Sequence, residues 1–384
     1  MSTWKTVKLS DIGTIVGGAT PATSHDEYYN GDIPWLTPKD LAGYAGRYIS
    51  RGERNISRAG LESCSAKILP KNSILFSSRA PIGYIAIAQN DLCTNQGFKS
   101  IIPNDKVDHL FLYYLLKYNK EKIESLGSGT TFKEVSAATM REVEVCLPED
   151  VLLQKKIARI LNSIDLKIEN NNCINNNLEQ QTATLFKAWF TDFIPFGKTL
   201  PLKWQKTSLG KIAKIGAGGD KPQKVSSCKT KDTPFPIYSN GITDEGLYGF
   251  TNHAKIIEES VTVSARGTIG FVCLRHTPYL PIVRLITLVP DTNFISAKYL
   301  YLYLKQLNIL GTGTTQQQLT VPNFRKTEVL LPTKKTMDTF TDIITPLFET
   351  IWINQAENNT LASLRDTLLP KLMSGEINAS DIAL

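Results

Sequence analysis

Only a few stretches of this 384-residue chain carry residue types that could support catalysis. The run Gly-Lys-Thr at 197–199 matches the end of a phosphate-binding loop, but Asp192 occupies the position of its upstream glycine. Asp150 and Asp165-Leu166-Lys167 could be arranged as a nuclease site, but they lie in a helical pattern where acids and lysines are ordinary solvated surface. The H-E-x-x-H, G-x-S-x-G, G-x-G-x-x-G and N-P-P-[YF] motifs are absent. We therefore predict a non-catalytic chain.

Composition limits the kinds of protein that this chain could be. The six cysteines are scattered, without a CxxC pair or a nearby histidine cluster, so neither a disulfide framework nor a metal site is expected. Forty-three basic and 36 acidic residues give a net charge of +7, which permits a polyanionic partner without requiring one. The N-terminus lacks the apolar core of a signal peptide, and the longest apolar runs, at 110–116 and 299–304, are too short to span a membrane. We expect a soluble, cytoplasmic protein of two or three domains.

The chain repeats itself. Residues 127–148 match residues 311–332 without a gap, and nine of these 22 positions are identical. The motif W-K-T-V-K-L-S-D-I-G that starts at Trp4 reappears as W-Q-K-T-S-L-G-K-I-A from Trp204. The sequence therefore predicts two copies of one module, and the segments that differ between the copies predict two versions of one recognition task.

One arginine occupies the same place in both modules. The segment I-L-F-S-S-R-A-P-I-G at 74–83 matches V-T-V-S-A-R-G-T-I-G at 261–270, which aligns Arg79 with Arg266. Each lies at the end of a strand-like run, before a glycine turn, where its guanidinium could contact guanine O6 and N7 or a phosphate. The alternative is an arginine that holds the loop in place. Because the residue recurs in both modules, which are expected to read different targets, we favour phosphate contact or a scaffold role over base reading.

A second repeated feature is the loop G-x-G-T-T, at 127–131 and 311–315. Its hydroxyls and backbone N–H groups suit phosphate contacts, although a helix stop and an ordinary turn would look the same. The residues that follow differ between the modules, as expected of base-reading residues, since lysine suits guanine and glutamine suits adenine. A polar surface loop is the alternative. The candidate DNA-contacting residues of these loops are Thr130, Thr131, Lys133, Thr314, Thr315, Gln316 and Gln317.

Two further polar segments differ between the modules. P-W-L-T-P-K-D at 34–40 offers Thr37 and Lys39, and P-I-Y-S-N-G-I-T at 236–243 offers Tyr238, Ser239 and Asn240 as further DNA-contact candidates. Turn chemistry is the alternative, because Asn-Gly is a strong turn pair.

The elements that would position these residues are of mixed type. Short runs rich in Ile, Val and Leu predict strands around 73–87, 98–102, 261–274 and 282–289. One helix is clear in each module, with Asp108 and Ser296 as candidate N-caps. The modules are therefore predicted to be α+β.

A long helix is predicted after each module. Apolar residues recur at three- and four-residue steps over 147–193 and again over 336–372. A helix of some 40 residues would be roughly 60 Å long, longer than a compact domain needs. Asparagine fills six of the eight positions 170–177, although it is a poor helix former. At core positions of a helix pair, asparagine can fix the register at some cost in stability. We expect this role for Asn171, Asn175, Asn354 and Asn358; an asparagine-rich solvated face is the alternative.

The ends of these helices carry the motifs L-F-K-A-W-F-T-D-F (185–193) and L-L-P-K-L-M-S-G-E-I (368–377). Together with the paired modules, they make the whole chain resemble the specificity (S) subunit of type I restriction–modification systems. The resemblance implies that each module is a target recognition domain that reads one half of a bipartite DNA sequence. It also implies two modification subunits, which use S-adenosylmethionine to methylate adenine, and restriction subunits that use ATP and Mg2+. No cofactor is expected in this chain.

The expected organisation follows from the repeat and the resemblance. The fold is predicted to be α+β, with two duplicated target recognition domains joined by two long antiparallel coiled-coil helices in a pseudo-twofold, circular arrangement. The first recognition domain is predicted at 1–148, the central spacer helix at 149–195, the second recognition domain at 196–332, and the C-terminal spacer helix and tail at 333–384.

Trp189, Phe190 and Leu372 are candidates for docking the modification subunits, or they close the hydrophobic end of a helix. Two other functions stay open: a coiled-coil scaffold that binds no DNA, and the specificity subunit of a related system whose partner fuses methylase and nuclease.

Overall fold

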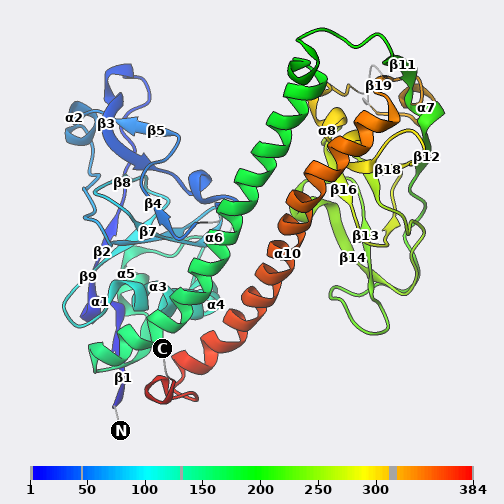
Figure 1. Ribbon diagram of the computed structural model, residues 1–384. Helices are drawn as coiled ribbons and strands as arrows, with labels where there is room; N and C mark the ends of the chain where they lie inside the picture. The colour runs from blue at the N-terminus through cyan, green and yellow to red at the C-terminus, as the bar shows by residue number, and fades with distance from the viewer. Residues whose placement is uncertain (1–2, 45, 130–132, 311–317, 383–384) are drawn as a thin grey trace. The chain divides into compact units, whose positions relative to one another are not determined.

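The computed structural model describes residues 3–44, 46–129, 133–310 and 318–382. The chain forms two compact units, residues 1–173 with 355–384 and residues 174–354. Each unit contains one globular module and part of both long helices, as Figure 1 shows by colour. Within the described residues, no helix combines the length and apolar character needed to cross a membrane.

The first module, residues 4–148, begins and ends in one strand pair. β1 (Trp4–Lys8) runs antiparallel to β10 (Glu144–Pro148), with Trp4 opposite Pro148. Between them lie a five-stranded sheet of order β2-β9-β6-β7-β4 and a three-stranded sheet of order β5-β3-β8. The strands are β2 (Gly13–Gly17), β3 (Tyr29–Leu36), β4 (Tyr48–Ile49), β5 (Arg54–Ile56), β6 (Ile74–Ser78), β7 (Ile82–Ala88), β8 (Cys93–Thr94) and β9 (Lys99–Pro103).

Short helices cover the sheets of this module. They are α1 (Leu9–Ile12), α2 (Arg58–Glu62), α3 (His109–Tyr118), α4 (Lys120–Ser125) and α5 (Ala137–Glu142), with 3-10 turns η1 (Asp26–Tyr28) and η2 (Pro38–Leu41). The predicted N-cap Asp108 is confirmed, because its Oδ1 accepts the N–H groups of Leu110 and Phe111, each at 3.0 Å. Six consecutive residues of α3, 111–116, are buried, and the helix packs against β7. Burial of this apolar helix face supplies much of the module's core.

The second module, residues 205–331, also begins and ends in a strand pair, β11 with β19. Its strands are β11 (Gln205–Ser208), β12 (Ala213–Ala217), β13 (Phe235–Tyr238), β14 (Leu247–Thr251), β15 (Ser260–Val263), β16 (Val272–Arg275), β17 (Leu280–Pro281), β18 (Ile286–Pro290) and β19 (Glu328–Leu331). Its helices are α7 (Leu209–Ile212), α8 (Ala297–Gln306) and α9 (Val321–Phe324), with η4 (Thr243–Gly246). Ser296 caps α8, as predicted, by accepting the N–H of Tyr299 at 3.2 Å.

The sheet orders of the two modules correspond. β11 pairs with β19 as β1 pairs with β10, and the order β12-β18-β15-β16 repeats β2-β9-β6-β7. The order β14-β13-β17 likewise repeats β5-β3-β8, including a parallel pair, β13 with β17 and β3 with β8. The modules are thus built on one strand plan, which agrees with the repeat in their sequences.

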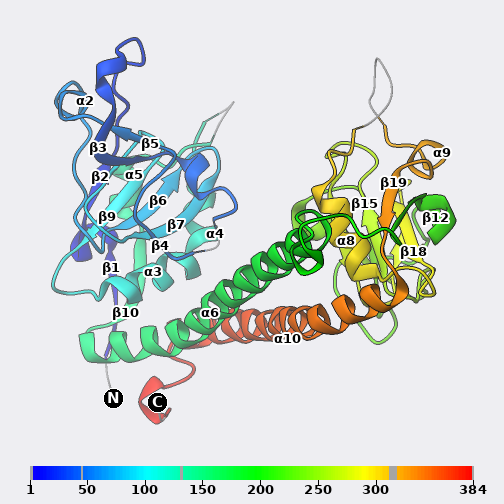
Figure 2. The same cartoon turned by 45° about the horizontal axis from the view of Figure 1, so that its top comes forward.

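Two helices of 40 residues each complete the chain: α6 (Val151–Phe190) and α10 (Lys334–Met373). The prediction of a mixed helix-and-sheet fold with long helices is confirmed. In the first unit, Asp165 pairs with Arg365 and Asn171 with Asn358, so residue numbers rise along one helix as they fall along the other, and the two segments run antiparallel. Figure 2 shows them side by side within each unit. The remaining turns are η3 (Ile194–Phe196) and η5 (Ala379–Asp381).

Candidate functional site

In the first module, the connection between β6 and β7 carries Arg79. Its Nη1 lies 3.5 Å from Oε2 of Glu134, and the Nζ of Lys99 donates to the other oxygen of the same carboxylate at 3.0 Å. The next residue, Val135, donates its backbone N–H to the carbonyl of Ser78 at 3.0 Å. Glu134 and Val135, which follow the G-x-G-T-T loop, are therefore bonded to the β6–β7 region through both side-chain and backbone contacts.

The second module repeats this attachment around Arg266. Its Nη2 donates to Oε1 of Gln318 at 3.1 Å, and the N–H of Leu319 donates to the carbonyl of Ala265 at 3.0 Å. Glu134 and Gln318 are equivalent positions in the sequence repeat, so an arginine holds the same point of the loop in both modules. This geometry favours the scaffold role of Arg79 and Arg266.

The tips of both loops lie outside the described residues. They include six of the predicted DNA-contact residues: Thr130, Thr131, Thr314, Thr315, Gln316 and Gln317. The remaining candidate, Lys133, is described, and it is exposed just before the anchored Glu134. An exposed lysine beside an anchored loop can reach a polyanion without loss of a buried contact.

Thr37 and Lys39 lie at the start of η2. The backbone N–H and the hydroxyl of Thr37 both donate to Oδ2 of Asp40, at 2.7 and 2.8 Å. Lys39 is 80 % exposed, and its Nζ lies 3.1 Å from Oε2 of Glu53. The hydroxyl of Thr37 is thus engaged in local turn chemistry, whereas the surface ion pair of Lys39 is weak enough to exchange for another anion.

Asn240 joins two loops of the second module. Its Nδ2 donates to the carbonyl of Val283 at 2.7 Å, and its Oδ1 accepts the N–H of Ala265 at 2.7 Å. Both ends of the amide are therefore engaged by backbone, so the structure gives Asn240 a positioning role next to Arg266.

Tyr238 and Ser239 are also engaged within the module. Arg275 lies over the Tyr238 ring, 3.6 Å from its centroid, and burial raises the pKa of the Tyr238 phenol although the nearby Arg275 acts to lower it. Arg275 is itself buried, with its guanidinium bonded to the carboxylate and carbonyl of Glu245 at 2.9 and 2.6 Å. The N–H of Ser239 donates to the carbonyl of Gly246 at 2.8 Å. Sequence reasoning missed Arg275, because its partner lies 30 positions away.

A buried charge network fixes the first module to the long helices of its unit. Arg47 is 4 % exposed, and its guanidinium contacts both oxygens of Glu169 on α6, each at 2.8 Å. Burial acts to lower the pKa of Arg47, but bonding to Glu169 and the charges around it raise the pKa overall, so the group stays charged. Tyr114 on α3 donates to Asp165 at 2.6 Å, and Arg365 on α10 donates to the same carboxylate at 2.8 Å.

This network corrects one prediction. Asp165 was expected to be ordinary solvated surface, but it is 5 % exposed and bonded to two other elements. A carboxylate is tolerated there because two donors satisfy it. Helical periodicity alone could not indicate those donors.

The asparagines of the long helices face one another. In the first unit, Nδ2 of Asn171 donates to Oδ1 of Asn358 at 2.9 Å, and Asn358 donates in turn to Asn172 at 2.9 Å. One helical turn further along each helix, in the second unit, Asn354 donates to Oδ1 of Asn175 at 2.8 Å. Asn171 and Asn175 are buried. These contacts support a role in register over a solvated face.

Two of the three residues considered for partner docking are buried. Phe190 lies in an aromatic cluster with Trp204, Tyr299 and Phe340, at ring distances of 5.5, 4.8 and 4.7 Å. Leu372 is fully buried in the core of the first unit. Trp189 is only partly buried. The burial of the first two favours the alternative, in which they close the hydrophobic ends of the helices.

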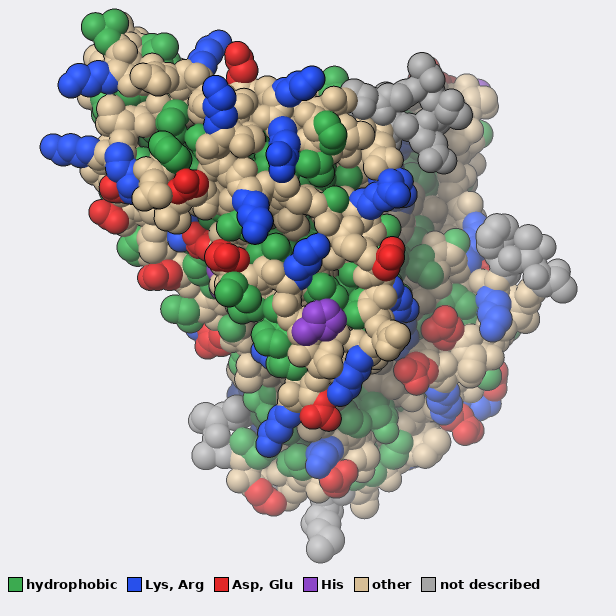
Figure 3. All heavy atoms as spheres, turned by 90° about the vertical axis from the view of Figure 1, so that its right-hand side faces the viewer, with side chains coloured by type: hydrophobic (Ala, Val, Ile, Leu, Met, Phe, Trp, Pro, Cys, Tyr) green, Lys and Arg blue, Asp and Glu red, His purple; other side chains and the backbone are tan. Residues whose placement is uncertain are grey.

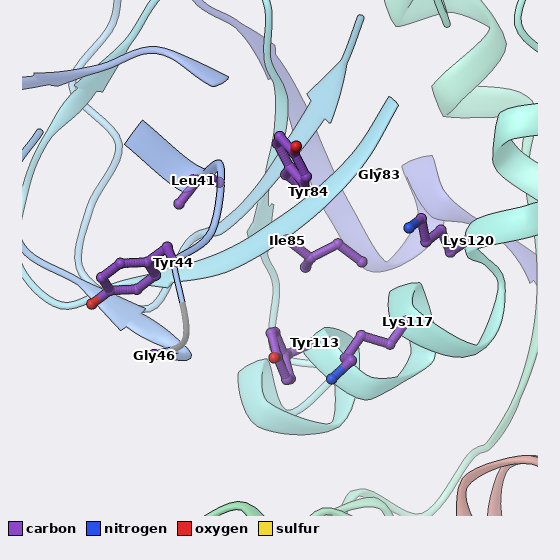
Figure 4. Close-up of a pocket in the computed structure, with 9 residues that line it drawn as sticks. All are labelled: Leu41, Tyr44, Gly46, Gly83, Tyr84, Ile85, Tyr113, Lys117 and Lys120. Atoms are coloured by element: carbon purple, nitrogen blue, oxygen red, sulfur yellow. The ribbon is translucent and has the colours of Figure 1, made fainter. Parts of the chain in front are cut away.

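A hollow of about 260 Å3 lies in the first module between β7, α3 and the η2 region (Figure 4). Tyr113 and Lys117 of α3 line it together with Lys120, and burial lowers the pKa of Lys117. Ammonium and phenol groups of this kind can hold an anionic group such as a phosphate or a carboxylate.

On the face shown in Figure 3, basic side chains do not form one uninterrupted block. Figure 3 shows lysine and arginine interspersed with acidic side chains on the face that includes the second module. Among the parts of the chain that the structure describes, no three His, Cys, Asp or Glu side chains are grouped so that they could hold a metal ion.

The chain has well-defined relatives. The family described as "Type I restriction modification DNA specificity domain" matches residues 1–180 and 201–363. The type I restriction enzyme MjaIX specificity subunit of Methanocaldococcus jannaschii is 35 % identical, over 99 % of this chain and 94 % of that protein. The HindI specificity subunit of Haemophilus influenzae is 25 % identical over 98 % of this chain and all of that protein.

A solved structure shares the fold. The crystal structure of the type I restriction–modification system S subunit from M. genitalium aligns with a TM-score of 0.65 at 20 % identity, over 97 % of this chain and 96 % of that one. The family match and the relatives agree along nearly the whole length. The chain therefore belongs to the type I restriction–modification specificity subunits, a family whose role is DNA-sequence recognition and whose members are not themselves catalytic.

Proposed function

We propose that this chain reads a bipartite DNA target, with one target recognition domain for each half-site and the two long helices as the spacer between them. The observation that carries the proposal is the repeated attachment of a loop to an arginine turn, Arg79 with Glu134 and Arg266 with Gln318. A loop held at the same point in two modules, but followed by different side chains, suits two readers of different sequences.

The duplicated, pseudo-twofold arrangement is part of this proposal. It is supported by the matching sheet orders and by the antiparallel pairing of α6 with α10. Two modules joined by paired helices of fixed length would hold two reading surfaces at a fixed separation, as two half-sites on one duplex require. In this proposal the recognition domains are residues 1–148 and 196–332, and the spacer segments are 149–195 and 333–384.

We propose that the predicted partners bind this chain as well. They are double-stranded DNA, two modification subunits and the restriction subunits. S-adenosylmethionine, ATP and Mg2+ would belong to those partner subunits and not to this chain. Of the three docking candidates, Trp189 is the one whose partial exposure leaves it able to contact a partner.

A selection experiment tests the proposal. The full chain, reconstituted with its modification subunits, is incubated at physiological salt with a pool of duplexes of randomised sequence, and the bound DNA is sequenced. We expect the enriched duplexes to share two short blocks separated by one fixed gap. Binding without any shared motif, which disappears as salt is raised, would be non-specific electrostatic binding and would contradict the proposal.

A further inference from the structure

The turn between β17 and β18 of the second module has an unusual backbone. Val283 and Arg284 are consecutive residues in the left-handed region, with φ of 52° and 59°. This conformation is uncommon for any residue except glycine and is a genuine outlier for a β-branched one. Such strain persists only where the surrounding structure imposes it, and it is concentrated at functional sites.

Backbone groups at the end of β12 impose this conformation. The N–H of Val283 donates to the carbonyl of Gly219 at 2.8 Å, and the N–H of Arg284 donates to the carbonyl of Gly218 at 3.1 Å. A Cβ atom on Gly218 would lie 2.6 Å from the carbonyl oxygen of Ile282, so only glycine permits this approach. One side of the turn is therefore held by the backbone of the two glycines that follow β12, Gly218 and Gly219.

Asn240 holds the other side and links the turn to the site already described. Its amide bonds the carbonyl of Val283 and the N–H of Ala265, each at 2.7 Å. Ala265 immediately precedes Arg266, and its carbonyl receives the N–H of Leu319 from the returning loop. The strained turn thus lies beside the arginine turn and the anchored loop of the second module.

The turn presents a free arginine to solvent. Of the four arginines in residues 205–331, Arg266, Arg275 and Arg325 donate to oxygen atoms of the module. The guanidinium of Arg284 has no hydrogen-bond or ion-pair partner among the described residues, and the side chain is exposed. Val283 beside it is 49 % exposed. The fixed turn therefore exposes two side chains to solvent: the guanidinium of Arg284 and the apolar side chain of Val283.

The first module has a turn at the equivalent place, with another backbone conformation and other side chains. The N–H of Asn95 donates to the carbonyl of Leu36 at 2.8 Å, as the N–H of Ile282 donates to that of Tyr238 at 2.9 Å. By this anchor Gln96 corresponds to Val283 and the buried Gly97 to Arg284, and neither Gln96 nor Gly97 shares the left-handed backbone. After this shared anchor, only the second module carries an arginine, whereas the first module has a glycine without a side chain at the same place. The position therefore differs between the modules, as we would expect of a residue that reads only one half-site.

We propose that Arg284 is a specificity-determining residue that reads a guanine in the half-site bound by the second module, a proposal that rests on the proposed function. The arginine fork can donate to guanine O6 and N7 together, and this pair is the most frequent specific contact in the major groove. Because the backbone is already fixed, little backbone freedom is lost when the contact forms. The neighbouring Val283 can pack against a thymine methyl group.

Methylation mapping of cells that carry the full chain with its modification subunits provides the test. The wild type gives the target, and the same mapping is done with Arg284→Lys, Arg284→Ala and the matched control Arg159→Ala, an exposed arginine of α6. Arg284→Lys keeps the charge but loses the two-pronged donor. Both Arg284 variants should accept another base at one guanine of one half-site, with preference for that guanine reduced about tenfold to a hundredfold in a duplex-binding assay.

The outcomes separate the two proposals. An unchanged motif and preference in Arg284→Ala would overturn the assignment while leaving the bipartite reading intact. Equal weakening on all sequences, with a shallower salt dependence, would also overturn it, because that behaviour marks a phosphate contact. The absence of any bipartite motif in the wild type would overturn the proposed function and this assignment together. The control should keep the wild-type motif, and the lysine variant guards against a folding defect in the alanine variant.

Discussion

At the scale of single residues, buried charges hold the first module in place. Arg47 is 4 % exposed and contacts Glu169, Asn162 and Tyr114, which lie on two different helices. A buried charge pair is weak evidence of net stability, because desolvation opposes the attraction, but removal of one partner leaves the other uncompensated. The contribution of Arg47 is therefore to fix the orientation of the module on α6.

We predict that Arg47→Met destabilises the chain by about 2 kcal/mol, less than a fully buried pair would lose, because Glu169 is 31 % exposed. Replacement of both residues by Met should recover part of that loss, since no charge is then left unpaired. Urea unfolding of these two variants and the wild type measures both effects. The control Lys39→Met breaks an exposed pair and should change stability by less than about 1 kcal/mol. Equal unfolding midpoints for Arg47→Met and the wild type would contradict the prediction.

At the scale of elements, the pair of long helices contains a buried polar side chain that lowers its stability. Asn171 is fully buried, and its Oδ1 has no partner among the described residues although its Nδ2 has two acceptors. An unsatisfied buried acceptor costs about 1–3 kcal/mol. The arrangement is reasonable if the asparagine pairs select one alignment of α6 on α10, as polar core positions do in coiled coils.

Exchange of this pair for leucine should separate stability from register. We predict that Asn171→Leu with Asn358→Leu raises the free energy of unfolding by about 1 kcal/mol, because the unsatisfied group is removed. The same variant should bind duplexes whose gap is one base pair longer or shorter with less discrimination than the wild type. The matched control replaces the exposed Asn176 and Asn359 by leucine and should leave gap discrimination unchanged. If gap discrimination survives in the buried variant, the register role is wrong.

Features of this fold that depend on local sequence could be predicted, whereas contacts between distant residues could not. Both 40-residue helices and the caps Asp108 and Ser296 could be predicted, because helical periodicity and capping are local signals. The roles of Arg47 and Arg275 could not be predicted, because their carboxylate partners are distant in the sequence. Glu169 lies 122 positions from Arg47, and Glu245 lies across a loop from Arg275. Thr37 and Asn240 illustrate the same limit at the site. Their types suit both turns and DNA contacts, and only the structure shows that local groups already engage them.

At the scale of the whole molecule, the proposed function requires two recognition domains and one spacer between them. The two modules share strand order and the attachment of loop to arginine, whereas the residues at equivalent turns differ, as Gly97 and Arg284 do. The proposed function therefore predicts that one half of the target can change while the other half and the gap stay the same.

The most direct test of the central claim is module replacement followed by methylation mapping. Residues 1–148 are replaced by the corresponding module of another specificity subunit, and the hybrid is expressed with the modification subunits of this system. The account predicts a new sequence in one half-site, with the other half-site and the gap unchanged, because residues 149–384 still supply the second reader and both spacer helices. A hybrid that modifies DNA with both half-sites altered, or with a different gap, would contradict it.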